Sequence, residues 1–194
     1  MDAIIKYLLR MLVYMAAVAP FYIAARAVFV KKRHKKTTIA REIAMLLFAM
    51  TATGVASQTL IPEFVITETG ITFLKTSFSS NNFIPFNVFY VTFTEVVKNK
   101  NIYSLIINFL GNIAVFIPFG IFIPALWRVS AKRTVLIGFL ISFFIELCQL
   151  FTPRSTDVDD LWLNALGVFI GTVIFKVADN LIKRKTAASE KENS

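Results

Sequence analysis

Long apolar runs alternate with short polar stretches along this chain, and nearly all of the charge lies in the polar stretches. A helix needs about 20 apolar residues to cross a hydrocarbon core of about 30 Å. The runs that approach this length are residues 4–30, 43–61, 102–127, 135–151 and 161–177. The pattern therefore predicts an all-α, polytopic transmembrane helix bundle of about five spans.

Composition strengthens this prediction and removes two alternatives. Hydrophobic residues make up 56% of the 194, which is above the roughly 45–50% apolar content of soluble domains. The mean hydropathy is +0.66. The net charge of +9 comes from residues that flank the apolar runs, so it indicates membrane topology and not nucleic-acid binding. Residues 4–30 are too long for a secretory signal. Cys148 is the single cysteine, which excludes a disulfide within the chain.

The distribution of Lys and Arg predicts the orientation, because cytoplasmic loops carry the positive excess. Residues 31–41 hold six such cations, and further groups lie at 128–133 and from 176 onward. With five spans, the N-terminus is then outside and the C-terminus inside. The polar tail, residues 179–194, is expected to be disordered in the cytoplasm.

The same orientation leaves residues 62–101 as a long extracytoplasmic loop between spans two and three. Residues 64–73 are β-branched and partly alternating around Gly70, which is a hairpin signal. Residues 82–87 are apolar and contain Pro85. We expect this part of the loop to lie in the membrane interface or to pack on the bundle.

Polar residues inside the spans gather toward the outer end. Asn108 and Asn112 are four apart in span three, so they share a helix face. Glu146 and Gln149 share a face near the outer end of span four. The outer start of span five holds a further polar set with helical spacing: Asp157, Asp160 and Asn164.

Glu146 is the most informative of these residues, because an ionisable group in hydrocarbon costs several kcal/mol unless it is paired or hydrated. Its predicted partner is Arg154, just after Pro153. A structural ion pair would explain both residues without any further function. Asp157 is equally compatible with an N-cap of span five, and the amide side chains with hydrogen bonds between helices.

Small residues predict close packing around this polar face. Gly167 and Gly171 form a Gly-x-x-x-Gly spacing on the face of Asp160 and Asn164. Pro118, followed by Gly120, is expected to interrupt span three and to shape the floor of an outward-opening pocket.

These motifs together resemble the VanZ-like domain. The resemblance is carried by the Asn-Phe-Ile-Pro-Phe stretch at 82–86, by Asn108 to Gly120, by Glu146 with Gln149, and by Arg154 to Gly171. It covers about residues 50–178. The chain is accordingly divided into a first helix with a basic loop (1–42), a VanZ-like transmembrane domain (43–178) and the tail (179–194).

The resemblance implies a bacterial, multi-pass protein of the cytoplasmic membrane that lowers susceptibility to teicoplanin-type lipoglycopeptides. We expect an outward polar pocket to bind a membrane-lipid headgroup or an amphipathic ligand such as a lipid-linked cell-wall precursor. The expected ligand-binding residues are Asn87, Asn108, Asn112, Gln149, Arg154 and Asn164.

Two other function classes remain open. A membrane-embedded enzyme acting on lipid-linked envelope precursors would use Glu146, Asp157 and Asp160 as catalytic residues. No cofactor is evident, but Asp157 and Asp160 are candidate ligands for a divalent cation. The sequence shows no nucleophile with a partnered base, and His34 lies in the basic loop. A small transporter is the third class, and no internal repeat supports it.

Overall fold

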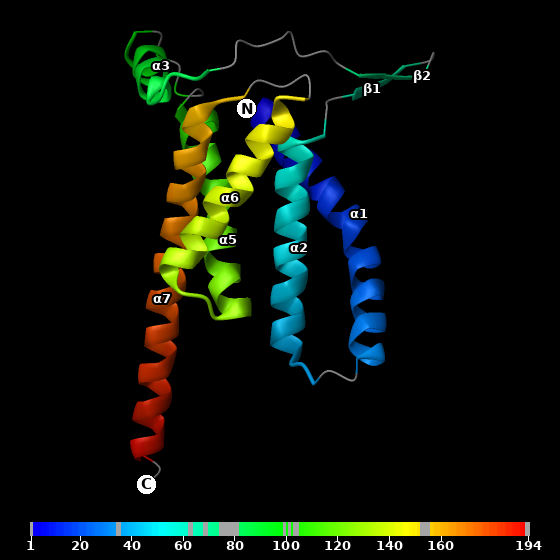
Figure 1. Cartoon of the computed structure of the whole chain (residues 1–194), viewed down its shortest axis with the longest axis vertical. Coiled ribbons are helices and arrows are strands. Elements are labelled where there is room, and N and C mark those ends of the chain that lie inside the picture. The colour runs from blue at the N-terminus through cyan, green and yellow to red at the C-terminus, as the bar shows by residue number, and fades with distance from the viewer. Residues whose placement is uncertain are drawn as a thin grey trace.

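The computed structural model describes residues 2–33, 36–61, 64–67, 70–73, 82–98, 100, 102, 105–151 and 156–192. Its elements, in chain order, are α1 (Asp2–Lys32), α2 (Ile39–Thr59), β1 (Phe64–Thr67), β2 (Gly70–Phe73), α3 (Asn87–Val97), the π-helix η1 (Leu105–Gly111), α5 (Asn112–Trp127), α6 (Ala131–Gln149) and α7 (Val158–Glu192). The fold is helical apart from one short hairpin (Figure 1).

Among the described residues, four stretches of helix are long and apolar enough to cross a membrane: Tyr7–Lys32, Ile39–Thr59, Phe109–Trp127 and Val158–Glu190. This confirms a multi-pass membrane protein, although it does not by itself confirm five crossings. The remaining long helix, α6, has 19 residues but carries Lys132, Arg133 and Glu146.

The contacts between helices give their relative directions. Along α1 and α2, Gly54 lies against Met11 and Met15, and the Gln58 amide donates to the Tyr7 carbonyl oxygen at 3.3 Å, which makes this pair antiparallel. On α7, Gly167 lies against Ile113 of α5, and Gly171, one turn later, lies against Ile117, one turn later on α5. The contacts run in the same direction along both helices, so this pair is parallel.

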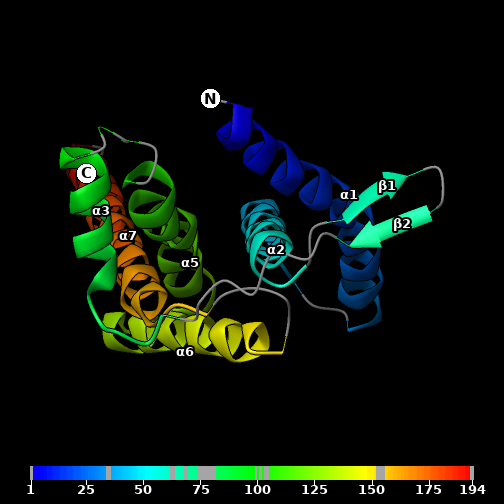
Figure 2. The ribbon, with the colours of Figure 1, turned by 90° about the horizontal axis from the view of Figure 1, so that it is seen from above.

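Helix α6 connects the end of α5 to the start of α7 and packs antiparallel against α7. Its Gly138 contacts Val168 on α7, and its Ser142 bonds Asn164, which lies earlier in α7. Seen from above, α6 is strongly tilted relative to α5 and α7 (Figure 2).

The apolar core lies where α2, α5, α6 and α7 meet. It is a cluster of buried side chains: Val55, Phe116, Phe119, Ile123, Ile145 and Val168. The ring of Phe48 on α2 packs edge-on against Phe119, with 5.7 Å between the ring centroids. α1 lies at the periphery, against α2, and much of its apolar surface is exposed.

One end of the bundle carries the elements of the predicted outer loop (Figure 1). β1 and β2 pair antiparallel, with Phe64 opposite Phe73 and Thr67 opposite Gly70, as expected for the hairpin. Helix α3 lies across this end, above the start of α7 (Figure 2). Segment 82–87 packs on the bundle, because Asn82 forms a parallel bridge with Asp157.

Two local expectations differ from the structure. The tail was expected to be disordered, but α7 continues as helix to Glu192, since its Lys, Glu and Ala residues are strong helix formers that extend a helix already nucleated in the bundle. Pro118 does not break its helix either. α5 is continuous from Asn112 to Trp127, and the irregular turn is the π-helix that precedes it.

Candidate functional site

Close backbone contact between α5 and α7 sets the geometry of the polar face. A Cβ built on Gly167 would lie 2.2 Å from the carbonyl oxygen of Ile113, and one on Gly171 would lie 2.0 Å from that of Ile117. From α5, a Cβ on Gly120 would lie 2.1 Å from the carbonyl oxygen of Val168. These glycines bring Asn112 on α5 to the level of Asp160 on α7.

Asp157 is the N-cap of α7. Its Oδ1 accepts from the backbone N–H of Asp159 at 2.9 Å, and its carbonyl accepts from the N–H of Asp160 at 3.1 Å. The same Oδ1 accepts from the Asn82 side chain at 2.9 Å. The backbone of Asn82 also accepts from Val158 at 3.0 Å and donates to Thr156 at 2.9 Å. The cap therefore joins the start of α7 to the segment before α3.

Asp159 holds the start of α3. Its Oδ1 accepts from the Phe86 N–H at 2.5 Å and from the indole N–H of Trp162 at 2.8 Å. Its Oδ2 accepts from the Val88 N–H at 2.7 Å. The side chain is fully buried, and within the described part of the chain it is the acceptor for all three donors.

An aromatic cluster reinforces this contact. The Trp162 ring stacks on Phe89 of α3, with 5.2 Å between centroids, and lies 5.7 Å from the Phe86 ring. Phe109 of η1 packs against Phe89 at 5.3 Å. Aromatic contacts and the Asp159 hydrogen bonds thus hold α3 onto the bundle together.

Glu146, which is buried, and Asp160, which is half-buried, form the acidic centre of the site. Glu146 is 5% exposed, and its Oε2 accepts from the Asp157 N–H at 3.0 Å. Asp160 Oδ1 accepts from the Asn112 side chain, and the Asp160 carboxylate interacts electrostatically with those of Glu146, Asp157 and Asp159. The sequence-predicted acids of α6 and α7 therefore share one site.

Two amides complete the polar face on α6 and α7. Asn164 donates to the Ser142 hydroxyl at 2.9 Å, and Gln149 donates to the Thr59 carbonyl of α2 at 3.2 Å. Asn164 is 6% exposed, and its Oδ1 has no hydrogen-bond partner among the described residues. These bonds between helices are the structural role that amides commonly have in membranes.

Burial raises the pKa of Asp157 above its ordinary value, and the neighbouring Asp159 carboxylate adds to the effect. Hydrogen bonds from the Asp159 N–H and from Asn82 oppose the shift. Within the described ranges, no group of three or more His, Cys, Asp or Glu residues is arranged to hold a metal ion. Asp157 and Asp160, the candidate cation ligands, each accept a side-chain hydrogen bond from an asparagine.

Three further residues were predicted to bind the ligand, at positions 87, 108 and 154. Asn87 begins α3 and is half-buried, with no side-chain hydrogen bond in the described part of the chain. Asn108 lies in η1, but its side chain is outside the described set. Arg154 also lies outside the described residues, so its predicted pairing with Glu146 stays a prediction.

Four residues of this region were not among the predicted site residues: Asp159, Asn82, Ser142 and Trp162. Asp159 had a visible signal, because it lies one residue before Asp160 and is therefore about 100° away around the helix. That rotation turns it from the α5 side toward α3. The Asn-Phe-Ile-Pro-Phe stretch, 82–86, carried a second signal, since it brings Asn82 and the Phe86 N–H to these acids.

Comparison with known proteins identifies the family. The family model described as VanZ/LLP1 matches residues 43–179, from within α2 to within the exposed part of α7. No curated protein and no solved structure matches the chain significantly. The match covers more than half of the 194 residues, including every described acid and amide of the site. The chain belongs to the VanZ/LLP1 family.

Proposed function

We propose that this protein binds the polar head of an amphipathic envelope molecule at the outer face of the bacterial cytoplasmic membrane, and thereby lowers susceptibility to teicoplanin-type lipoglycopeptides. The supporting observation is a set of acceptor oxygens at one end of the bundle to which no donor among the described residues is hydrogen-bonded. Asn164 Oδ1 is one, and Glu146 and Asp160 each use only one carboxylate oxygen in the described hydrogen bonds.

The chemistry of these atoms indicates the class of ligand. Carboxylate and amide oxygens accept hydrogen bonds from hydroxyl and ammonium groups, and charge-assisted bonds of this kind are the stronger ones. A sugar or amine headgroup, from a lipid or from a lipoglycopeptide, supplies such donors. Asp157 and Asp159 contribute less directly, because their bonds hold α7 and α3 in place.

Susceptibility measurements test this function. Expression of the full chain in a susceptible strain is expected to raise the inhibitory concentration of teicoplanin more than that of vancomycin. Glu146→Gln and Asp160→Asn should each remove most of the rise, because each replaces a charged acceptor by a neutral one. Asp179→Asn is the matched control, since Asp179 forms an exposed pair with Lys183 far along α7.

Protein amounts in the membrane must be equal for all variants. If the inhibitory concentration of teicoplanin is unchanged although the protein is well inserted, the proposed function is contradicted. If Glu146→Gln and Asp160→Asn both keep full resistance, the acidic centre is not needed for the proposed function.

The proposed location requires five crossings with the acidic site outside. α5 and α7 are parallel neighbours, so α6 must return the chain across the same thickness. Its 19 residues span about 28 Å, close to the ~30 Å hydrocarbon core. Lys132 and Arg133 lie at its start and Glu146 near its end, which leaves the middle uncharged. The end of α1, the start of α2 and the turn between α5 and α6 lie at the end opposite α3 (Figure 1), and all three carry basic residues.

Cysteine labelling tests this orientation. On a Cys148→Ala background, Asn87→Cys is expected to react with a membrane-impermeant maleimide added to intact cells with a permeabilised outer envelope. Lys132→Cys, at the basic end, should react only after the cytoplasmic membrane is opened. The reverse pattern would overturn the orientation and, with it, the external site.

A further inference from the structure

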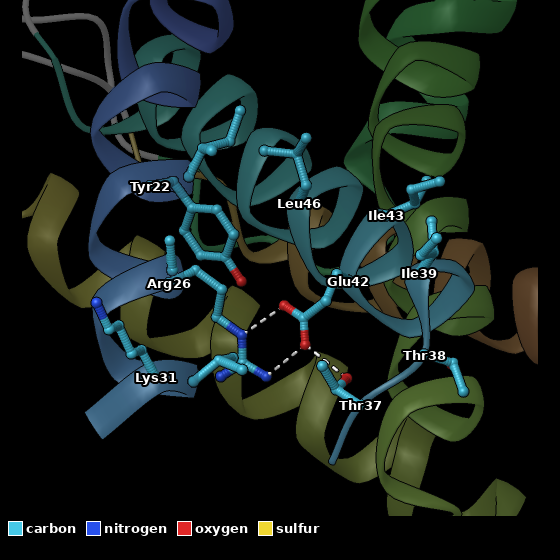
Figure 3. Close-up of a pocket in the computed structure, with 12 residues that line it drawn as sticks. Tyr22, Arg26, Lys31, Thr37, Thr38, Ile39, Glu42, Ile43 and Leu46 are labelled. Carbon is cyan, nitrogen blue, oxygen red and sulfur yellow. Dashed lines mark hydrogen bonds and ion pairs between the residues drawn. The ribbon is translucent and has the colours of Figure 1, made fainter. Parts of the chain in front are cut away.

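A second candidate site lies at the opposite end of the bundle, between α1 and α2. The two helices diverge around a groove of about 510 Å³ near the loop that joins them (Figure 3). Its walls are mainly apolar and include Ile23, Ala27, Val30, Ile43 and Leu46. This volume is in the range of small-molecule sites, about 300–1,000 Å³.

A satisfied ion pair closes the polar side of this groove. Arg26 donates two hydrogen bonds to Glu42, from Nε to Oε2 at 2.7 Å and from Nη2 to Oε1 at 3.0 Å. Thr37 donates to Glu42 Oε1 at 2.7 Å, and the Tyr22 hydroxyl points toward the pair (Figure 3). Glu42 is thus occupied by protein donors, so it offers little negative charge to a ligand.

The surroundings of the groove are strongly basic. Residues 26–42 contain seven Lys and Arg against the single Glu42. Lys31 lines the groove, and Lys36 and Arg41 are exposed beside it. These three cations form no ion pair within the described part of the chain. An apolar cavity next to exposed cations is complementary to a molecule with an acyl chain and an anionic head.

We propose that this groove binds one anionic phospholipid, with an acyl chain between α1 and α2 and the phosphate at Lys31 and its basic neighbours. The lipid belongs to the leaflet at the basic end of the bundle. Basic pockets between transmembrane helices bind anionic headgroups in this way. The groove lies near the loop between α1 and α2, at the end of the bundle opposite α3 (Figure 1), so it is separate from the acidic cluster.

Native mass spectrometry of the full-length protein in detergent tests the proposal. Phosphatidylglycerol and phosphatidylcholine with identical acyl chains are titrated separately. We expect one phosphatidylglycerol to bind more tightly than phosphatidylcholine, and Lys31→Gln with Lys36→Gln to weaken its binding about fivefold for each cation removed. Both lysines are exposed, so this double variant should fold normally.

A pair of tryptophan variants separates the groove from ordinary annular lipid. Ala27→Trp places an indole in the groove and is expected to abolish the single tight phosphatidylglycerol. Ala25→Trp is the matched control, because Ala25 is an exposed alanine of the same helix that does not line the groove. Equal affinity for the two lipids would overturn the proposal. So would unchanged phosphatidylglycerol binding in a folded Ala27→Trp protein.

Discussion

Gly171→Ala is expected to be among the most destabilising single-methyl substitutions in this protein. The new Cβ would lie 2.0 Å from the Ile117 carbonyl oxygen and 3.0 Å from the Cα of Gly120. Both neighbours are backbone atoms, so α5 and α7 must separate to admit the methyl group. Overpacking of this kind typically costs about 1–3 kcal/mol, and occasionally more. Thermal unfolding of the detergent-purified protein measures the loss.

Gly54→Ala is the matched control for this prediction. Its Cβ would meet Met11 Cε at 3.0 Å and Met15 Sδ at 3.1 Å, and these flexible side-chain ends can move aside. The melting temperature should therefore fall much less than in Gly171→Ala. Equal stability of Gly171→Ala and the parent protein would show that the close contact of α5 and α7 does not exist.

Asp159→Ala is expected to release α3 from the bundle. The Phe86 and Val88 N–H groups and the Trp162 indole would each lose their acceptor, and a buried donor without a partner costs about 1–3 kcal/mol. Exposure of α3 to water would recover these hydrogen bonds. Amide hydrogen exchange across residues 87–97 should therefore rise sharply, with a smaller change in α5.

Trp162 emission provides a second measurement, on a Trp127→Phe background that leaves one tryptophan. Release of α3 removes the Phe86 and Phe89 rings from this indole, so its emission should shift to longer wavelength. Asp179→Ala, which breaks an exposed pair, should leave both readouts unchanged. Slow exchange in α3 of Asp159→Ala would contradict the role assigned to Asp159.

The helices were predictable from the sequence because long apolar runs have only one stable environment, the membrane interior. Their ends were less predictable, since they depend on particular neighbours. α6 begins at Ala131, ahead of its apolar run, and α7 begins at Val158, where Asp157 supplies the cap. The helical tail was missed because its polar composition resembles disorder, whereas a preceding rigid helix favours its continuation.

Helical spacing predicted part of the site. Residues three or four apart share a face, so Glu146, Asp160 and Asn164 could be placed toward the bundle interior. Spacing cannot reveal partners distant in sequence. Asp159 and Phe86 are 73 residues apart, and their contact requires the loop to return over α7. The assignment of open and occupied carboxylate oxygens likewise needed the three-dimensional structure.

The position of Asp159 has an electrical consequence as well. The N-terminus of α3 directs two backbone N–H groups at this fully buried carboxylate, which itself lies in the first turn of α7. The aligned peptide dipoles of a helix place about half a positive charge at its N-terminus, so the N-terminus of α3 offsets part of this negative charge. A lysine side chain could move away from such a carboxylate by changing its rotamer. The N-terminus of a helix can move away only if the whole helix dissociates from the bundle. The docking of α3 and the compensation of this charge are therefore one event, lost or gained together.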